Sequence, residues 1–382
     1  MTTETPVEYR QSASRLASGA RWRLDPRNNS LNLIRLVLAA AVLVSHAFPL
    51  AGQGEGPRLA GETLGGWAVI GFFAISGYLI TGSRLRTAFG EYLTHRIARI
   101  FPAFLVCLVV TALAFAPVSY FRANGSLSGF FSTPNTPINY VFANSLLRMN
   151  DYSIAGTPSG VPYPGAWNGS LWTLYYEFLC YLIVGILACL VVVRRSPWGI
   201  AVAFVVSVLV QANLGTVLEY TGHNQDVIFL AKLLPYFLGG ALVFMLKKWI
   251  PLTWPIAVSS FVVAGTTVLV WNDWGGQAAA PLFAVALLWL GSVIPAPVWT
   301  QRNDISYGLY VYAFPVQQLL ATFGVHEHGM WIYILAAFPP TIALAMLSWF
   351  GVERPVMRRV RRTPRPAQAA EPATRTPGGT TA

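Results

Sequence analysis

Residues 31–50 read LNLIRLVLAAAVLVSHAFPL, and this stretch decides the fold class of the chain. It is long and apolar enough for a helix that crosses a membrane, since about 20 such residues span the hydrocarbon core of a bilayer. Two of its side chains, Arg35 and His46, are polar. Such side chains inside a spanning helix usually face the protein interior and mark a functional site. An arginine reaching the membrane interface and a histidine bonded to a neighbouring helix explain this pair equally well.

The spacing of Arg35 and His46 places both on one face of the helix. At about 100° and 1.5 Å per residue, their separation is about three turns, or roughly 16 Å along the axis. One residue could therefore bind a ligand while the other takes part in the chemistry at a different depth in the membrane.

The composition of the 382-residue chain is that of a polytopic membrane protein. Hydrophobic residues make up 54% and charged residues 11% of it, and the mean hydropathy is +0.51. A soluble domain of this size cannot bury so much apolar surface. The sequence predicts an all-α bundle of about ten transmembrane helices, at residues 31–50, 64–82, 98–118, 170–193, 197–217, 228–246, 251–271, 278–294, 305–323 and 331–350.

Charge distribution predicts the orientation. Most of the 26 lysines and arginines fall on one side of the predicted helices if the N-terminus is cytoplasmic, so the positive-inside rule puts both termini in the cytoplasm. Topology and contacts with the lipid bilayer explain the net charge of +11, and no nucleic-acid partner is implied. We expect a cytoplasmic segment at 1–30, a membrane domain at 31–360 and a disordered cytoplasmic tail at 361–382.

Two more arginines precede the third predicted span, in the sequence YLTHRIARIFP (92–102). Arg96 and Arg99 are three residues apart and therefore share a helix face. Together with Arg35 they would form a pocket for phosphates, which planar guanidinium groups bind well. A positive-inside anchor is at least as common a role for any single arginine of this kind.

Two acids lie in or beside predicted spans. Glu177 falls about two turns into the fourth span, where an unpaired carboxylate is unfavourable. We expect it to contact His46 and to fix the tautomer of the imidazole, so that the two form a catalytic pair. Glu353 is expected to pair with an arginine of the inner side and to end the last helix before Pro355.

Other polar and aromatic side chains are candidates for substrate binding: Ser76, Tyr78, Trp172 and Tyr176. The second span also carries small residues, including Ala74 and Gly77, that allow close helix contact. The outer segment 119–169 contains many aromatic residues, which would either cover a sugar acceptor as a lid or lie at the membrane interface. The three cysteines lack the spacing of metal ligands, so no metal site is predicted.

Six motifs in sequence order resemble the acyltransferase 3 family: Arg35 with His46, GFFAISGYLI (71–80), RIAR (96–99), LWTLYYEF (171–178), SYGLYVYAFPV (306–316) and VERP (352–355). This family comprises integral membrane O-acyltransferases of surface glycans and secondary metabolites. The resemblance implies a cytoplasmic acyl-CoA donor, usually acetyl-CoA, as a substrate and no bound cofactor. It also implies a carbohydrate or glycolipid acceptor, a catalytic His46, and functional arginines at Arg35, Arg96 and Arg99. Two positions depart from the family: Ala313 stands where many members have histidine, and Asn32 where aspartate is common.

A second class of function is compatible with the same residues. A proton-coupled secondary transporter or exporter also places histidine, glutamate and arginine inside a bundle. The two halves of the chain show no obvious repeat, and the titratable residues concentrate in the first four predicted spans. Both observations favour the enzyme, located as a multi-pass protein in the cell (inner or plasma) membrane.

Overall fold

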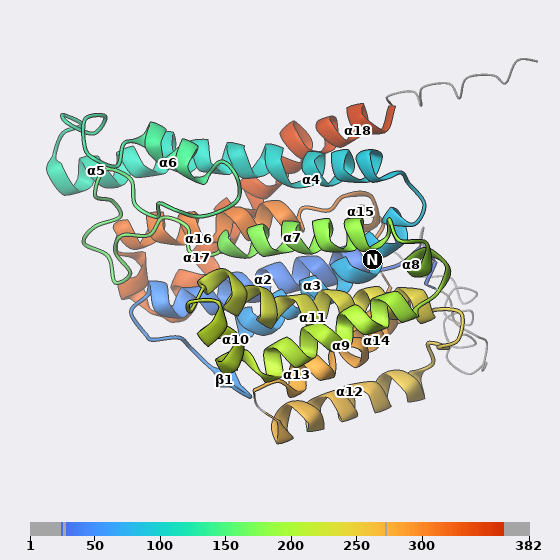
Figure 1. Cartoon of the computed structure of the whole chain (residues 1–382). Helices are drawn as coiled ribbons and strands as arrows, with labels where there is room; N and C mark the ends of the chain where they lie inside the picture. The colour runs from blue at the N-terminus through green and yellow to red at the C-terminus, as the bar shows by residue number, and fades with distance from the viewer. Residues whose placement is uncertain (1–23, 26–27, 272, 296, 363–382) are drawn as a thin grey trace, which may run out of the picture.

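The computed structural model describes residues 24–25, 28–271, 273–295 and 297–362. The predicted cytoplasmic segment 1–30 and tail 361–382 lie almost wholly outside these residues. Most of the described chain is helical, which confirms the all-α prediction, and the long helices run side by side in one bundle (Figure 1).

The elements follow one another along the chain with short connections, apart from the segment between α5 and α7. The α-helices are α2 (Leu31–Leu50), α3 (Leu64–Arg84), α4 (Phe89–Val110), α5 (Ala116–Asn124), α6 (Pro137–Asn144), α7 (Trp172–Leu187), α8 (Val191–Arg195), α9 (Trp198–Ala212), α10 (Leu214–Tyr220), α11 (Gln225–Leu246), α12 (Trp254–Val270), α13 (Gly275–Ala278), α14 (Ala280–Val293), α15 (Val298–Arg302), α16 (Ser306–Thr322), α17 (Met330–Ser348) and α18 (Arg354–Arg362). Two π-helical segments, η1 (Thr111–Phe115) and η3 (Trp349–Glu353), a 3₁₀ turn, η2 (Val325–His328), and a two-stranded hairpin of β1 (Arg58–Leu59) and β2 (Glu62–Thr63) complete the fold.

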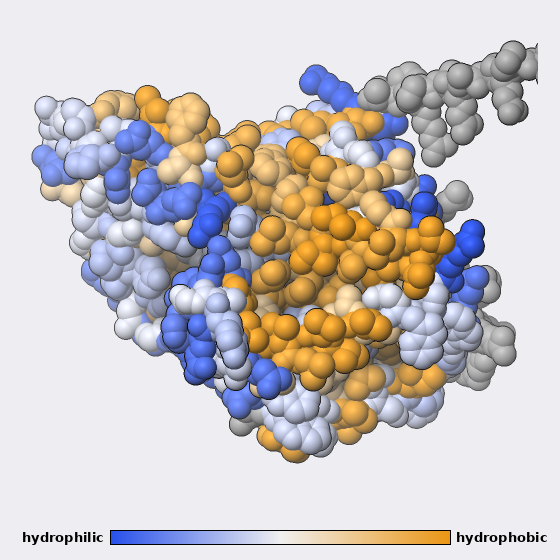
Figure 2. All heavy atoms as spheres, in the orientation of Figure 1, coloured by the Kyte–Doolittle hydropathy of each residue, from blue (hydrophilic) through white to orange (hydrophobic). Residues whose placement is uncertain are grey.

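Each of the ten predicted apolar segments contains a helix. In the part of the chain that the structure describes, five helices are long and apolar enough to cross a membrane, and a sixth crossing is possible if α9 and α10, bent by 85°, act as one span. Helices α7, α12 and α14 are apolar but shorter. Figure 2 shows a broad apolar face across the middle of the molecule, with hydrophilic residues toward both ends of the bundle. The chain is therefore a multi-pass membrane protein.

The centre of the bundle is a close contact between α3 and α11. A Cβ atom at Gly77 would collide with the carbonyl oxygen of Phe237, and one at Gly240 with the carbonyl oxygen of Ala74. Small residues let helix backbones approach in this way, as the sequence predicts for α3.

The bundle has two ends that differ in their elements. The basic end holds the first residues of α2 and the last residues of α3 and α11, and it lies toward the right of Figure 1. The loop end is opposite, where α2 ends and where α5, α6 and α10 lie.

The segment before α7 enters the bundle from the loop end. The side-chain amide of Asn168 is fully buried and donates to the carbonyl oxygen of Val311, within α16, at 2.8 Å. The neighbouring Trp167 is also fully buried, and its indole N–H donates to Thr157 Oγ1 at 3.0 Å. Because this non-helical segment has already entered the bundle, α7 begins inside the protein.

The last long helix does not end before Pro355, so that prediction is wrong. Helix α17 passes through η3 and continues as α18. A proline lacks the N–H that an α-helix needs, and the change to π-type hydrogen bonding just before it accommodates the missing bond.

Candidate active site

Four charged side chains meet near the basic end. Arg35 Nη1 lies 2.6 Å from Asp304 Oδ2, and Arg99 Nη2 lies 2.6 Å from the same oxygen. The other nitrogen of Arg99, Nη1, lies 2.7 Å from Glu353 Oε2. We call these residues the four-charge cluster. Its two cations and two anions balance, and its pairing of Glu353 with an arginine confirms the sequence-based expectation.

Asp304 lies in the turn before α16 and is the member of the cluster that sequence reasoning missed. Its Oδ1 accepts hydrogen bonds from the backbone N–H and the hydroxyl of Ser306, at 3.3 and 2.5 Å. Burial raises the pKa of Asp304, but the two arginines and the bonds from Ser306 outweigh it, so its pKa lies below the ordinary value. One signal was available: Asp304 is an acid just before a predicted span, on the side where the arginines gather.

Arg96 belongs to a neighbouring cavity of about 360 Å³, which His95, Arg99 and Asp304 also line. Its guanidinium lies 6.0 Å from the centre of the Tyr181 ring. The Nε of Arg96 is buried, and within the described residues it has no hydrogen-bond partner. Of the three predicted phosphate-binding arginines, Arg35 and Arg99 thus meet through Asp304, and Arg96 keeps an unused donor beside this cavity.

Glu177 lies on the Arg35 side of the molecule. Both residues line a small cavity of about 30 Å³. Oε1 of Glu177 accepts hydrogen bonds from Ser76 Oγ at 2.9 Å and from the hydroxyl of Tyr181 at 2.6 Å. No hydrogen bond of the described chain joins it to His46, so the predicted contact differs from the structure. The predicted depth of Glu177 assumes that its helix starts at the loop end. Because α7 begins inside the bundle, Glu177 lies further toward the basic end.

His46 lines a third cavity of about 270 Å³ at the loop end, together with Ser45, Trp172 and the ion pair of Glu62 and Lys232. Its imidazole packs edge-to-face on the ring of Phe314, with 5.2 Å between ring centres. An aromatic edge holds an imidazole in place but leaves its ring nitrogens available. His46 can therefore exchange a proton with a group that enters this cavity.

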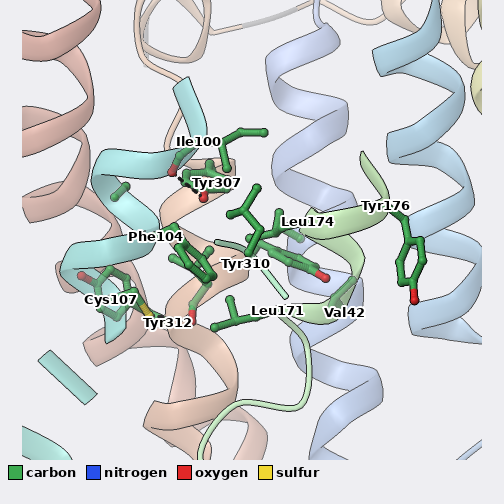
Figure 3. Close-up of a cluster of buried hydrophobic side chains, with 14 of the residues drawn as sticks. Val42, Ile100, Phe104, Cys107, Leu171, Leu174, Tyr176, Tyr307, Tyr310 and Tyr312 are labelled. Carbon is green, nitrogen blue, oxygen red and sulfur yellow. Dashed lines mark hydrogen bonds between the residues drawn. The ribbon is translucent and has the colours of Figure 1, made fainter. Parts of the chain in front are cut away.

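Tyr310 and Thr173 separate the Arg35 cavity from the His46 cavity, because both residues line both spaces. The two hydroxyl groups are hydrogen-bonded to each other, and that of Tyr310 also donates to the carbonyl oxygen of Ser170 at 2.5 Å. In Figure 3 the Tyr310 ring reaches from α16 toward α7 and α2. We call this contact the tyrosine partition.

The four predicted substrate-binding residues do not form one site. Trp172 faces the His46 cavity, and its ring packs on Phe229 with 4.5 Å between centres. The hydroxyl of Tyr176 donates to Asp226 at 2.9 Å. The remaining two lie away from His46: the hydroxyl of Ser76 bonds to Glu177, and Tyr78 lines a cavity at the basic end.

One aromatic residue of the long outer segment approaches the His46 neighbourhood. The ring of Tyr163 lies 6.0 Å from that of Phe314, which contacts His46. Gln318 fixes this part of the segment, because its amide donates to the carbonyl oxygens of Tyr163 and Ala166, both at 2.7 Å. In contrast, Phe121 is 54% exposed. The outer segment thus combines a part that covers the His46 region with a part that faces outward.

Comparisons with known proteins show which family the chain belongs to. The family model described as an acyltransferase domain matches residues 28–350. A protein of Shigella phage Sf6 named O-acetyl transferase is 32% identical over 354 residues, which cover 87% of this chain and 97% of that protein. Nodulation protein 10 of Rhizobium leguminosarum bv. viciae is 29% identical over 370 residues, which cover 86% of this chain and 93% of that protein. No solved structure matches significantly.

The matched region contains every candidate residue described above except Glu353. The chain belongs to the acyltransferase 3 family and is a multi-pass membrane acyltransferase.

Proposed function

We propose that this protein transfers an acetyl group from acetyl-CoA to a hydroxyl group of a cell-surface or exported carbohydrate. One observation carries the proposal: inside the bundle, the cavities of Arg96, Arg35 and His46 follow one another, with shared or interacting residues between them. A donor with a long flexible arm suits such an arrangement, since Arg35 and His46 are separated by about three helical turns. The relative named O-acetyl transferase supports acetyl as the group and oxygen as the acceptor atom.

The proposal places the basic end in the cytoplasm and the protein in the cell membrane. The positive-inside bias of the sequence supports this orientation. Acyl-CoA is made in the cytoplasm and would enter at the basic end, where Arg96 offers an unused donor to a phosphate. The acceptor would then approach His46 from the loop end, on the outer side.

In the proposed reaction, His46 acts as the general base. It removes the proton from the acceptor hydroxyl while the oxygen attacks the carbonyl carbon of the thioester. The carbon–sulfur bond then breaks, and the departing CoA thiolate takes the proton back from His46. The products are the acetyl ester and free CoA, so atoms and protons balance.

Glu177 has a different role in this proposal from that of a partner of His46. Its bonds to Ser76 and Tyr181 hold it in the wall of the Arg35 cavity. There it would position the donor arm next to the tyrosine partition. The thioester reaches His46 only when the hydroxyl groups of Tyr310 and Thr173 move apart.

The His46 cavity has the features of a site for a neutral, hydroxyl-rich acceptor. The Trp172 indole offers an aromatic face, on which a sugar ring packs well. Glu62 and Lys232 neutralise each other there and can exchange hydrogen bonds with hydroxyl groups. These features support a carbohydrate over a strongly charged acceptor.

The test is to compare cell-envelope and secreted glycans by mass between strains with and without the gene, and with the gene encoding His46→Ala. The expected result is one glycan whose mass increases by one acetyl group only when the unaltered protein is made. Identical glycans in all three strains would contradict a carbohydrate acceptor.

A further inference from the structure

The short segment 168–170 joins the outer segment to α7, and each of its residues contacts α16. Asn168 and Ser170 are buried. The three contacts reach a carbonyl group, an aromatic ring and a hydroxyl group, which belong to Val311, Phe314 and Tyr310. Because this part of α16 holds both the ring that contacts His46 and the tyrosine partition, the segment is placed to influence both.

The first contact depends on a proline of α16. Pro315 has no N–H, so the carbonyl oxygen of Val311, four residues earlier, lacks its helical donor. The Asn168 amide donates to this oxygen at 2.8 Å, and the thiol of Cys107 donates to it at 3.3 Å. Oδ1 of Asn168 in turn accepts from the backbone N–H and the hydroxyl of Ser170, at 3.2 and 2.8 Å. The segment is thus bonded to α16 at the one turn where the proline leaves an acceptor open.

The second contact reaches the ring that packs on His46. A Cβ atom at Gly169 would lie 2.9 Å from two carbon atoms of the Phe314 ring, whereas carbon atoms pack at about 3.5–4.0 Å. The Phe314 ring is buried, and its centre lies 5.2 Å from that of the His46 imidazole and 6.0 Å from that of Tyr163. A methyl group at residue 169 would therefore displace this ring, and the contact of the ring with His46 would change.

The third contact holds the tyrosine partition. The carbonyl oxygen of Ser170 accepts from the hydroxyl of Tyr310 at 2.5 Å. Ser170, Thr173 and Tyr310 all line the His46 cavity. The segment therefore meets the active site on two sides, at the ring beside the imidazole and at the boundary that the donor must pass.

We propose that segment 168–170 positions the catalytic machinery, with Gly169 setting the place of the His46 imidazole through the Phe314 ring. Asn168 and Ser170 keep the segment against α16 so that this contact persists. The inference rests on the proposed function, in which His46 is the general base. Gly169 is a positioning residue, so a methyl group there should slow the chemical step and leave donor binding intact.

The variant that tests this is Gly169→Ala, and Gly185→Ala is its matched control. A Cβ atom at Gly185 would also lie 2.9 Å from a phenylalanine ring, that of Phe89. Within the described residues, neither Gly185 nor Phe89 lines the His46 cavity. A misplacement of 1 Å can cost about 10²-fold in rate, so the smaller shift of a displaced ring should lower kcat about tenfold in Gly169→Ala. The KM for acetyl-CoA should stay unchanged, and the control should keep both constants.

A second substitution, Phe314→Leu, separates positioning through the ring from a general loss of stability. Leucine lacks the two ring atoms that a methyl group at residue 169 would meet. Gly169→Ala should therefore leave kcat unchanged when Phe314→Leu is already present. An equal loss in both backgrounds, or an equal loss in Gly185→Ala, would overturn the proposal. If Gly169→Ala alone does not fold, Gly169→Ala/Phe314→Leu must fold, and its failure to do so would have the same consequence.

A measurement that is independent of activity reports the place of the imidazole. The ring current of a phenyl group shifts the proton signals of a neighbouring imidazole, so NMR spectra are recorded on protein with labelled histidine in nanodiscs. His46→Ala identifies the signal of the Hε1 proton of His46. We expect Gly169→Ala to move this signal and Gly185→Ala to leave it in place. An unmoved signal in Gly169→Ala would overturn positioning through Phe314. Failure of the proposed function is a different result, in which the signal moves but His46→Ala still transfers acetyl at the full rate.

Discussion

The two ends of α2 carry polar side chains in opposite situations. At the basic end, Arg35 is bonded to Asp304 and is linked through it to Arg99 and Glu353. At the loop end, His46 contacts an aromatic ring and lines an open cavity. Both residues are unfavourable in a membrane for the same reason, but the bundle gives Arg35 an ionic partner and leaves the ring nitrogens of His46 available.

This difference separates stability from chemistry. The ion pairs of the four-charge cluster link α2, α4 and η3 with the turn before α16. Within the described residues, the imidazole of His46 has no ionic partner, so it contributes little to folding and can carry a proton in a reaction. A substitution at His46 should therefore lower activity and leave stability unchanged, whereas a substitution in the four-charge cluster should lower stability.

The largest effect is expected for His46→Ala. Loss of a general base lowers a rate by about 10²–10⁴-fold, so acetyl transfer from acetyl-CoA should fall by that factor, as measured with labelled donor. The thermal unfolding midpoint should stay within a few degrees, since no ion pair among the described residues is lost with the ring. His328→Ala, at an exposed histidine of η2, serves as the control, and equal rates in both variants would remove His46 from the mechanism.

Asp304→Asn should lower the stability of the folded protein. Removing one partner of a buried ion pair destabilises a protein by about 3–5 kcal/mol, and here one substitution leaves two arginines partly unpaired. We expect a lower midpoint in a thermal or denaturant unfolding experiment on the purified protein. Asp273→Asn, at an exposed position, should leave the midpoint unchanged. If Asp304→Asn lowered activity at full stability, the cluster would be part of the chemistry after all.

The difference in stability between the unaltered protein and Asp304→Asn should depend on pH, because the pKa of Asp304 is lowered. The charged form is stabilised in the folded protein, so the advantage of the unaltered protein over Asp304→Asn is fully present above the ordinary aspartate pKa of about 3.9. It declines as the pH falls below that value through the lowered pKa. Unfolding midpoints of the two proteins at a series of pH values between about 7 and 3 would test this, and a difference that vanished near neutral pH would contradict it.

Tyr310→Phe probes the boundary between the two ends. The substitution removes the hydroxyl that bonds to Thr173 and to Ser170, so the tyrosine partition should open more often. We expect hydrolysis of acetyl-CoA without acceptor to rise about tenfold, because about 1.4 kcal/mol corresponds to that factor and one hydrogen bond contributes about as much. Tyr333→Phe is the matched control, since its buried hydroxyl donates to the carbonyl oxygen of Gln317 elsewhere in α16. Equal hydrolysis by the two variants would show that the partition does not limit access to His46.

Trp172→Ala should give the smallest effect, on the acceptor alone. The indole lines the His46 cavity, so its loss should raise the KM for the acceptor by roughly tenfold, in line with about 1–3 kcal/mol for an aromatic stacking contact. Acceptor-independent hydrolysis should stay unchanged. Trp198→Ala, on the exposed surface of α9, is the control, and a loss of donor affinity in Trp172→Ala would place the donor in the outer cavity.

The sequence predicts the helices well because each apolar segment is continuous along the chain. It also predicts the depths of Arg35 and His46, since both lie on one unbroken helix. The partners of these residues are different: Asp304 follows Arg35 by 269 residues, and no local pattern encodes such a contact. The sequence predicts a contact of Glu177 with His46 only if α7 begins at the loop end, whereas the buried segment around Asn168 shifts the start of α7 inward.

The most direct test of transfer through the bundle uses proteoliposomes in which the orientation of the protein is determined by protease digestion from one side. Acetyl-CoA labelled in the acetyl group is supplied only on the side of the basic end. We expect labelled acetate, or a labelled ester on an enclosed glycan, to accumulate in the compartment at the loop end while CoA stays on the donor side, and His46→Ala to abolish this. Label that appears only in the compartment of the donor would contradict transfer through the bundle.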